Sequence, residues 1–210
     1  MDPPPAGTTG YAADGSATAL LVLAHGAGAG QGHPFMVTTA RGLAARGLDV
    51  LTFDFPYMAA RRRVPDRAPV LEQRFRDAIE AARAWSRAGR LFIGGKSMGG
   101  RMATHLGAQG VDGLHGIVVL GDPLHPPGKP DQRRIAHLPA ITAPVFLAQG
   151  ERDPFGTPEE LAPVLEAMAA PVTLQVIPGG DHSLAVKGRK AGDVQDAVLD
   201  AITRWTTTTR

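Results

Sequence analysis

Residues 91–100 read LFIGGKSMGG, and this stretch decides the fold. Its apolar start is typical of a buried strand, and the small residues of segment 98–109 favour a helix. Between them, Gly95-Lys96-Ser97-Met98-Gly99 matches G-x-S-x-G. In a strand–turn–helix context this pattern is a nucleophile elbow, whose strained turn projects the serine Oγ above the sheet. Ser97 is therefore a candidate nucleophile; the alternative is a glycine-rich turn that contains a serine by chance.

Five further apolar runs of strand length surround this segment. Most are continuously apolar, as strands buried on both faces of a parallel sheet are. They are residues 19–24, 49–55, 116–121, 144–150 and 172–177. Apolar residues at helical spacing lie between the runs, most clearly in 71–85 and 194–205. This alternation predicts an α/β fold in which helices cover both faces of a mostly parallel sheet.

The chain of 210 residues suits a single domain, which we expect to span residues 18–205. Residues 1–17 are rich in Pro, Gly, Ala and Thr, and we expect a flexible lead-in that includes at most an irregular edge strand. Residues 206–210, TTTTR, are expected to form a tail. The longest irregular segments, 54–69 and 122–142, are too short for a large cap domain.

A base and an acid for Ser97 follow the later strands. Ligands of such sheets bind at the carboxyl ends of the strands, which meet at one edge. A serine hydroxyl needs a general base, and His182 follows the last apolar run in PGGDHS. The base needs an orienting carboxylate, and Asp153 follows the preceding run in GERDPFG. The chain order Ser97, Asp153, His182 is that of hydrolases with this architecture. Asp122, after another run, is the alternative acid.

Acyl transfer also needs two N–H groups that bind the developing oxyanion. Met98, which follows the nucleophile at the start of a helix, offers one. The loop HGAGAG at residues 25–30 follows the first apolar run and offers the other. We expect the second donor to be Ala27, with Gly28 as the alternative. Further candidates for lining the pocket are His25, Tyr57, Lys96, Asp122, His125 and Phe155.

Composition excludes several other functions. The chain has no cysteine, so disulfides, thiol nucleophiles and cysteine-ligated metals are excluded. A formal net charge of +2 and a basic run as short as Arg61-Arg62-Arg63 do not indicate nucleic-acid binding. No metal-binding spacing occurs, and Arg90 stands where a phosphate-binding loop ending in Gly95-Lys96-Ser97 needs glycine. We therefore expect no metal and no cofactor.

No apolar run is long enough to cross a bilayer, and the N-terminus carries no secretory signal. We therefore expect a cytoplasmic protein without a membrane partner.

Several longer segments resemble the α/β-hydrolase superfamily. They read LVLAHGAGAGQGHPFM, FDFPYM, GGKSMGGRMA, PLHPPGKP, APVFLAQGERDPFG and IPGGDHSL. The chain is most similar to the branch that includes testis-expressed protein 30 and the hydrolase-like domain of the third regulatory subunit of the NSL chromatin complex. The resemblance implies six to seven mostly parallel strands, a triad of Ser97, Asp153 and His182, and oxyanion donors at Met98 and Ala27. Dienelactone hydrolases are more distant, and their nucleophile is a cysteine where this chain has Ser97.

The sequence thus predicts a serine hydrolase that cleaves a small-molecule carboxylic ester through an acyl-enzyme on Ser97. Two alternatives stay open. A non-catalytic interaction module could use the same fold, and a thioesterase or peptidase could use the same triad.

Overall fold

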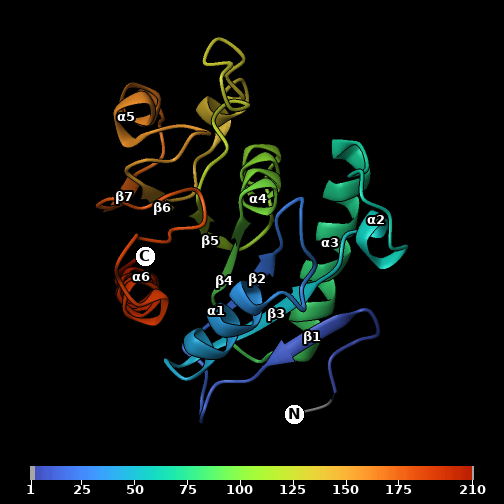
Figure 1. The fold of residues 1–210 in the computed structure, drawn as a ribbon. Helices are drawn as coiled ribbons and strands as arrows, with labels where there is room; N and C mark the ends of the chain where they lie inside the picture. The colour runs from blue at the N-terminus through green and yellow to red at the C-terminus, as the bar shows by residue number, and fades with distance from the viewer. Residues whose placement is uncertain (1–2, 210) are drawn as a thin grey trace.

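The computed structural model describes residues 3–209, and within them the chain forms one seven-stranded sheet (Figure 1). The strands are β1 (Thr8–Tyr11), β2 (Ala19–Ala24), β3 (Leu48–Phe53), β4 (Leu91–Lys96), β5 (Leu114–Leu120), β6 (Val145–Gly150) and β7 (Val172–Ile177). Their spatial order is β1-β3-β2-β4-β5-β6-β7. β1 is antiparallel to β3, and every other neighbouring pair is parallel. The mostly parallel sheet predicted from the apolar runs is confirmed.

Helices cover both faces of the sheet, as Figure 1 shows. They are α1 (Pro34–Ala44), α2 (Pro56–Ala59), α3 (Ala68–Trp85), α4 (Met98–Gln109), the 3-10 helix η1 (Leu138–Ala140), α5 (Pro158–Glu166) and α6 (Ala191–Thr208). Successive residues of β2 enter opposite layers of the core. Leu21 and Leu23 pack with α1 and α6, whereas Leu20 and Val22 pack with α3 and α4. Burial on both faces explains why this strand is apolar throughout.

The lead-in expected at residues 1–17 contains the edge strand that was allowed for there, and this strand is regular. Thr8–Tyr11 forms the edge strand β1, paired residue by residue with β3. The backbone of Gly10 lies so close to Trp85 that an added Cβ would come within 2.6 Å of the indole ring. Backbone pairing and this aromatic contact order a segment whose composition alone indicates a loop. Residues 1 and 2 lie outside the described residues.

The predicted tail at residues 206–210 also needs correction, because α6 continues to Thr208. Thr206 is buried, and its carbonyl accepts a hydrogen bond of 2.7 Å from Nη1 of Arg90. The hydroxyls of Thr207 and Thr208 donate to carbonyls one turn earlier in the helix. The burial of Thr206 and its bond from Arg90 hold the helix together through residues of modest helix propensity. Residue 210 lies outside the described residues.

The turn between β4 and α4 lies against the end of β2 with almost no free space. A Cβ on Gly95 would lie 2.5 Å from the carbonyl oxygen of Ala24, and one on Gly99 would lie 2.4 Å from the same atom. Ser97, between them, has a φ of 51° and a ψ of −117°. A left-handed backbone is unfavourable for a residue with a side chain and persists only where the surrounding structure enforces it. The strained turn that G-x-S-x-G predicts is therefore confirmed.

We predict that Gly99→Ala lowers the free energy of unfolding by about 3 kcal/mol, because the new methyl group meets backbone oxygens that cannot move independently. Gly192→Ala is the matched control, since both glycines occupy the second position of a helix and Gly192 has open space around its Cα. This control should be as stable as the wild type or more stable by about 0.5 kcal/mol. Urea denaturation measures both values, and equal stability of the two variants would contradict the steric argument.

Candidate functional site

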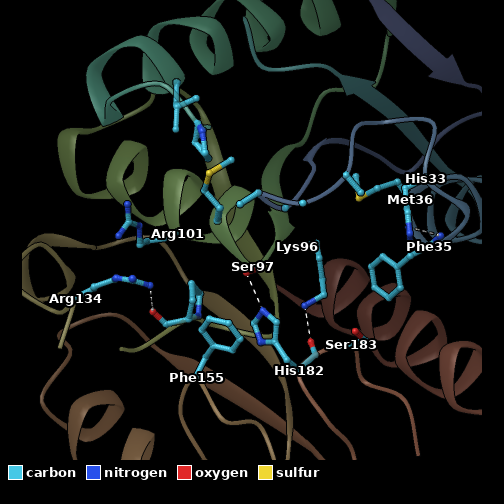
Figure 2. Close-up of a pocket in the computed structure, with 18 of the residues that line it drawn as sticks. His33, Phe35, Met36, Lys96, Ser97, Arg101, Arg134, Phe155, His182 and Ser183 are labelled. Atoms are coloured by element: carbon cyan, nitrogen blue, oxygen red, sulfur yellow. Dashed lines mark hydrogen bonds between the residues drawn. The ribbon is translucent and has the colours of Figure 1, made fainter. Parts of the chain in front are cut away.

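Three side chains at the carboxyl edge of the sheet form one hydrogen-bonded chain (Figure 2). Ser97 stands at the turn after β4, Asp153 follows β6, and His182 follows β7. The hydroxyl of Ser97 donates to Nε2 of His182 over 2.8 Å. Nδ1–H of the same ring donates to Oδ2 of Asp153 over 2.7 Å. The structure therefore brings together the three residues that the sequence selected. In this arrangement the ring can accept the serine proton while the carboxylate fixes its tautomer.

Asp153 is buried, and two further donors hold its carboxylate. The backbone N–H of Phe155 donates to Oδ1 over 2.8 Å, and Nε2 of Gln149 donates to Oδ2 over 2.9 Å. Gln149 is fully buried and also donates to the carbonyl of Gly156. Gln149 was not among the residues predicted from the sequence; its signal is a polar side chain near the end of an otherwise apolar strand. Three donors to a buried carboxylate hold it in one orientation.

Asp122 does not take the place of the acid. Its backbone N–H donates to Oε1 of Gln149 over 2.7 Å, and its carboxylate makes no hydrogen bond to His182. Burial raises the pKa of Asp122 to about 6, against the attraction of Arg101. Gln149 therefore connects the ends of β5 and β6. Of the two candidate acids, Asp153 and not Asp122 accepts the hydrogen bond from His182.

His25 and Tyr57 support the loop of residues 26–29. They do not line the cleft, so the prediction that they are pocket residues is wrong. The ring of His25 is fully buried; its Nδ1–H donates to the carbonyl of Gly26 over 2.7 Å, and its Nε2 accepts from the N–H of Phe55 over 3.1 Å. The bond from Phe55 requires an unprotonated Nε2, and burial lowers the pKa of His25, which favours the neutral ring. The hydroxyl of Tyr57 donates to the carbonyl of Ala27 over 2.9 Å. Burial raises the pKa of Tyr57 to about 12, so this donor keeps its proton.

Met98 and Ala27 line the cleft beside Ser97, and both carry a backbone N–H. Met98 is the first residue of α4, and Ala27 follows the loop anchor His25. Within residues 3–209, neither N–H donates a hydrogen bond to another part of the chain. The N-terminus of a helix also carries a partial positive charge, which favours an anion there. The pair is suited to bind a negatively charged oxygen, and Gly28, which also lines the cleft, stands next to it.

Lys96 lines the cleft, as expected, but its ammonium is occupied. Nζ donates to the carbonyl oxygen of His182 over 2.5 Å and so holds the loop that carries the imidazole. Burial lowers the pKa of Lys96 to about 8, although Asp153 and Asp181 attract its charge. Phe155 also lines the cleft, with its ring 4.2 Å from that of His182 between centroids.

The expected pocket role of His125 is wrong. Its Nδ1 bonds the carbonyl of Pro126, and its Nε2 lies 3.3 Å from a carboxylate oxygen of Glu160. The ring is therefore directed into the packing between the 122–137 loop and α5. His125 and Asp122 are near Pro123 in the sequence, and Pro123 lines the cleft, but neither of the two residues lines it.

The cleft has a volume of about 620 Å³, and Ser97 and His182 lie on its wall. Phe35 and Met36 from the start of α1 form an apolar side. Arg101 of α4 and Arg134 of the 122–137 loop reach it from another side, as Figure 2 shows. Such a volume suits a small organic molecule.

The chain matches the alpha/beta hydrolase domain family over residues 17–209. It belongs to this family. Among solved structures, this α/β hydrolase is similar to Est1E from Butyrivibrio proteoclasticus, with a TM-score of 0.76, 14% identity, and coverage of 96% of this chain and 93% of that chain. It is also similar to a dienelactone hydrolase from Anabaena variabilis, with a TM-score of 0.75, 22% identity, and coverage of 96% and 91%.

A third similar structure is an α/β serine hydrolase without a lid from Xanthomonas campestris. Its TM-score is 0.76 at 18% identity, and the match covers 97% of this chain and 90% of that chain. Within residues 3–209, this chain likewise has no cap domain inserted between its strands and helices. None of the described helices is long and apolar enough to span a membrane. At these identities the similarities show the α/β-hydrolase fold.

We predict that the α/β hydrolase loses stability as the pH falls from 6.5 toward 4. Burial lowers the pKa of His25, and burial with the charges of His105 and Arg101 lowers the pKa of His137 to about 4. The unfolded chain therefore binds protons in this window that the folded protein does not, which favours unfolding. His137 alone should contribute about 1 kcal/mol between pH 7.5 and pH 5, after allowance for its partial exposure.

Urea denaturation at both pH values measures the effect. His137→Gln should show a smaller loss than the wild type, whereas the control His115→Gln, on a partly exposed ring, should match the wild type. An identical pH dependence in all three proteins would exclude His137 as a source.

Proposed function

We propose that this α/β hydrolase is a serine esterase that cleaves a small carboxylic ester through an acyl-enzyme on Ser97. Nε2 of His182 takes the Ser97 proton while Oγ attacks the ester carbonyl carbon. The carbonyl oxygen becomes an oxyanion held by the N–H groups of Met98 and Ala27. When the tetrahedral intermediate collapses, the C–O bond to the alcohol breaks and His182 gives the alcohol its proton. Water then attacks the acyl group with His182 as base, which releases the acid and restores Ser97.

The observation that carries the proposal is the unbroken hydrogen-bonded chain from Ser97 through His182 to Asp153. Beside it stand the N–H groups of Met98 and Ala27, which have no hydrogen-bond partner within residues 3–209. A hydroxyl in ordinary surroundings is a poor nucleophile, and its activation needs all three parts in hydrogen-bond contact. Family membership and the esterases among the similar structures support hydrolase activity. The proposal names no cofactor and no metal, because every step uses groups of this chain.

Two finer points belong to the same proposal. We place the chain in the branch with testis-expressed protein 30 and the NSL-subunit domain, on the segments quoted above. The partner is a small-molecule ester rather than a nucleic acid or a membrane, and a cytoplasmic location fits the cysteine-free sequence.

We predict that a fluorophosphonate forms a single adduct with the wild type, detected by intact-protein mass spectrometry. Ser97→Ala should form none, and His182→Ala should react at least about 100-fold more slowly because the base is lost. Ser183→Ala is the matched control: Ser183 also lines the cleft, but its hydroxyl makes no hydrogen bond to His182 within the described residues. It should be labelled at the wild-type rate.

An adduct that persists in Ser97→Ala would place the nucleophile elsewhere. A folded wild type that is not labelled would contradict the esterase proposal and favour an interaction module on the same fold. A labelled protein that prefers thioesters or amides over matched oxygen esters would retain the mechanism and change the substrate class.

We predict a preference for short acyl groups. No cap domain covers the cleft of about 620 Å³ in the part of the chain that the structure describes. A long acyl chain would therefore leave most of its methylenes in water and gain little from binding. In a series of p-nitrophenyl esters, kcat/KM should be highest between acetate and hexanoate and at least about tenfold lower for palmitate. A maximum at palmitate would overturn this view of the cleft.

A further inference from the structure

Two arginine side chains in the cleft are not used by the mechanism above. We propose that the ester carries a carboxylate, and that the guanidinium groups of Arg101 and Arg134 bind it at one end of the cleft. This inference rests on the proposed function, since it names the substrate class of the same site.

Arg101 stands one turn beyond the nucleophile on α4, where its backbone N–H donates to the carbonyl of Ser97 over 3.0 Å. Arg101 lines the cleft, and the helix holds its backbone at a fixed position relative to Ser97. Nε of Arg101 is buried and has no hydrogen-bond partner in the described part of the chain. A buried donor without an acceptor is unfavourable, so such a group commonly marks the place of a ligand or ordered water.

Arg134 approaches from the 122–137 loop and is held there. Its Nη1 donates to the carbonyl of Pro123 over 3.1 Å, and its backbone N–H donates to the carbonyl of Leu124 over 2.8 Å. The guanidinium thus keeps donors that are directed at no other group within residues 3–209. Burial and the repulsion of Arg134 both lower the pKa of Arg101. Two cations that repel each other in a partly buried cleft would be stabilised by an anion between them.

The carboxylates nearby do not supply that anion. None of the ion pairs among the described residues includes Arg101 or Arg134. Asp66 lines the cleft, but both of its oxygens accept from Nη2 of Arg62, at 2.7 and 2.9 Å. Asp122 attracts Arg101 without contacting it. The third cation of the cleft, Lys96, is directed at the His182 carbonyl instead.

Glu72 also attracts Arg101 but is bound elsewhere. Its two oxygens accept from His105 and Gln109, each at 2.8 Å. The two guanidinium groups therefore face the cleft with no carboxylate of the described chain bound to either.

The basic run noted in the sequence borders the same cleft. Arg61, Arg63 and Arg67 are exposed on the segment between α2 and α3, and Pro65 and Asp66 of this segment line the cleft. Exposed positive charges around an opening attract anions and raise their association rate. We therefore assign this basic run the role of attracting an anionic substrate to the cleft.

The opposite side of the cleft fits an uncharged group. In Figure 2, Arg101 and Arg134 lie on one side of Ser97, and Phe35 and Met36 lie on the other. An ester bound across Ser97 therefore has one arm beside the guanidiniums and one arm against apolar side chains. A carboxylate binds a guanidinium through two parallel hydrogen bonds, which gives orientation as well as affinity.

Two matched substrate pairs test the inference. p-Nitrophenyl hemiglutarate against p-nitrophenyl pentanoate places the charge on the acyl side, and 4-acetoxybenzoate against 4-acetoxybenzamide places it on the alcohol side. Each kcat/KM is normalised to spontaneous hydrolysis of the same ester. The wild type should prefer the charged member of at least one pair by about tenfold or more, the effect of charge-assisted hydrogen bonds.

Arg101→Met and Arg134→Met, on two different elements, should each reduce that preference about tenfold, chiefly through KM, and leave the neutral ester within about twofold of the wild type. Arg204→Gln, an equal change of charge at an exposed position of α6, should keep the wild-type preference. No preference for the charged ester in either pair, or a preference that both methionine variants retain, would overturn the inference.

Two further measurements separate this failure from failure of the esterase proposal. If the fluorophosphonate labels Ser97 but no charged ester is preferred, the carboxylate site is rejected and the esterase proposal stands. If the folded wild type is neither labelled nor active, calorimetry with glutarate decides the site without catalysis. Binding that disappears in Arg101→Met supports the carboxylate site, and absence of binding by the wild type rejects it.

Discussion

The contact between the end of β2 and the turn from β4 to α4 is the constraint on which the rest of the site depends. Gly95 and Gly99 both lie against the carbonyl of Ala24, at distances that exclude any side chain. The contact forces Ser97 into a left-handed backbone and directs its side chain away from the sheet. Because the loop of His25 and Ala27 begins where β2 ends, the same contact sets the position of this loop relative to the nucleophile. One backbone packing interaction thus fixes the serine and both N–H groups beside it.

The other half of the site depends on ties between neighbouring loops. A Cβ on Gly150, at the end of β6, would lie 2.3 Å from the carbonyl of Asp181, so the loops after β6 and β7 are also in direct backbone contact. The N–H of Arg152 donates to the carbonyl of Gly180 over 2.8 Å. Lys96 then joins the histidine loop to the end of β4. Asp153 and His182 are therefore held by contacts among three strand ends rather than by one rigid element.

The sequence predicted the parts that depend on local pattern or chain order. Apolar runs identified six of the seven strands. Five of them are buried along most of their length, whereas β7 alternates between partly buried and exposed residues, and both patterns leave a signal within the strand itself. The order of Ser97, Asp153 and His182 after successive strands selected three residues that the fold brings into contact.

The sequence could not predict what depends on contacts between distant segments. β1 depends on pairing with β3, and Gln149 carries out its role only once the ends of β5 and β6 are side by side. His25, Tyr57 and His125 were reasonable candidates for the cleft, but the direction of a loop side chain depends on neighbours that one sequence does not specify. Arg101 stands four residues after the nucleophile and looks like any solvent-exposed helix residue until the 122–137 loop is in place.

The proposed oxyanion donors beside Ser97 are main-chain N–H groups, which affects how the gene can vary. Every amino acid except proline carries the same N–H, so codons 27 and 98 can change widely without removing either donor. Substitutions are instead not tolerated at Gly95 and Gly99, because any side chain there would prevent the close backbone contact that positions the turn. Loss-of-function alleles at this edge of the sheet should therefore concentrate at the glycines, while the residues named as donors accumulate neutral changes.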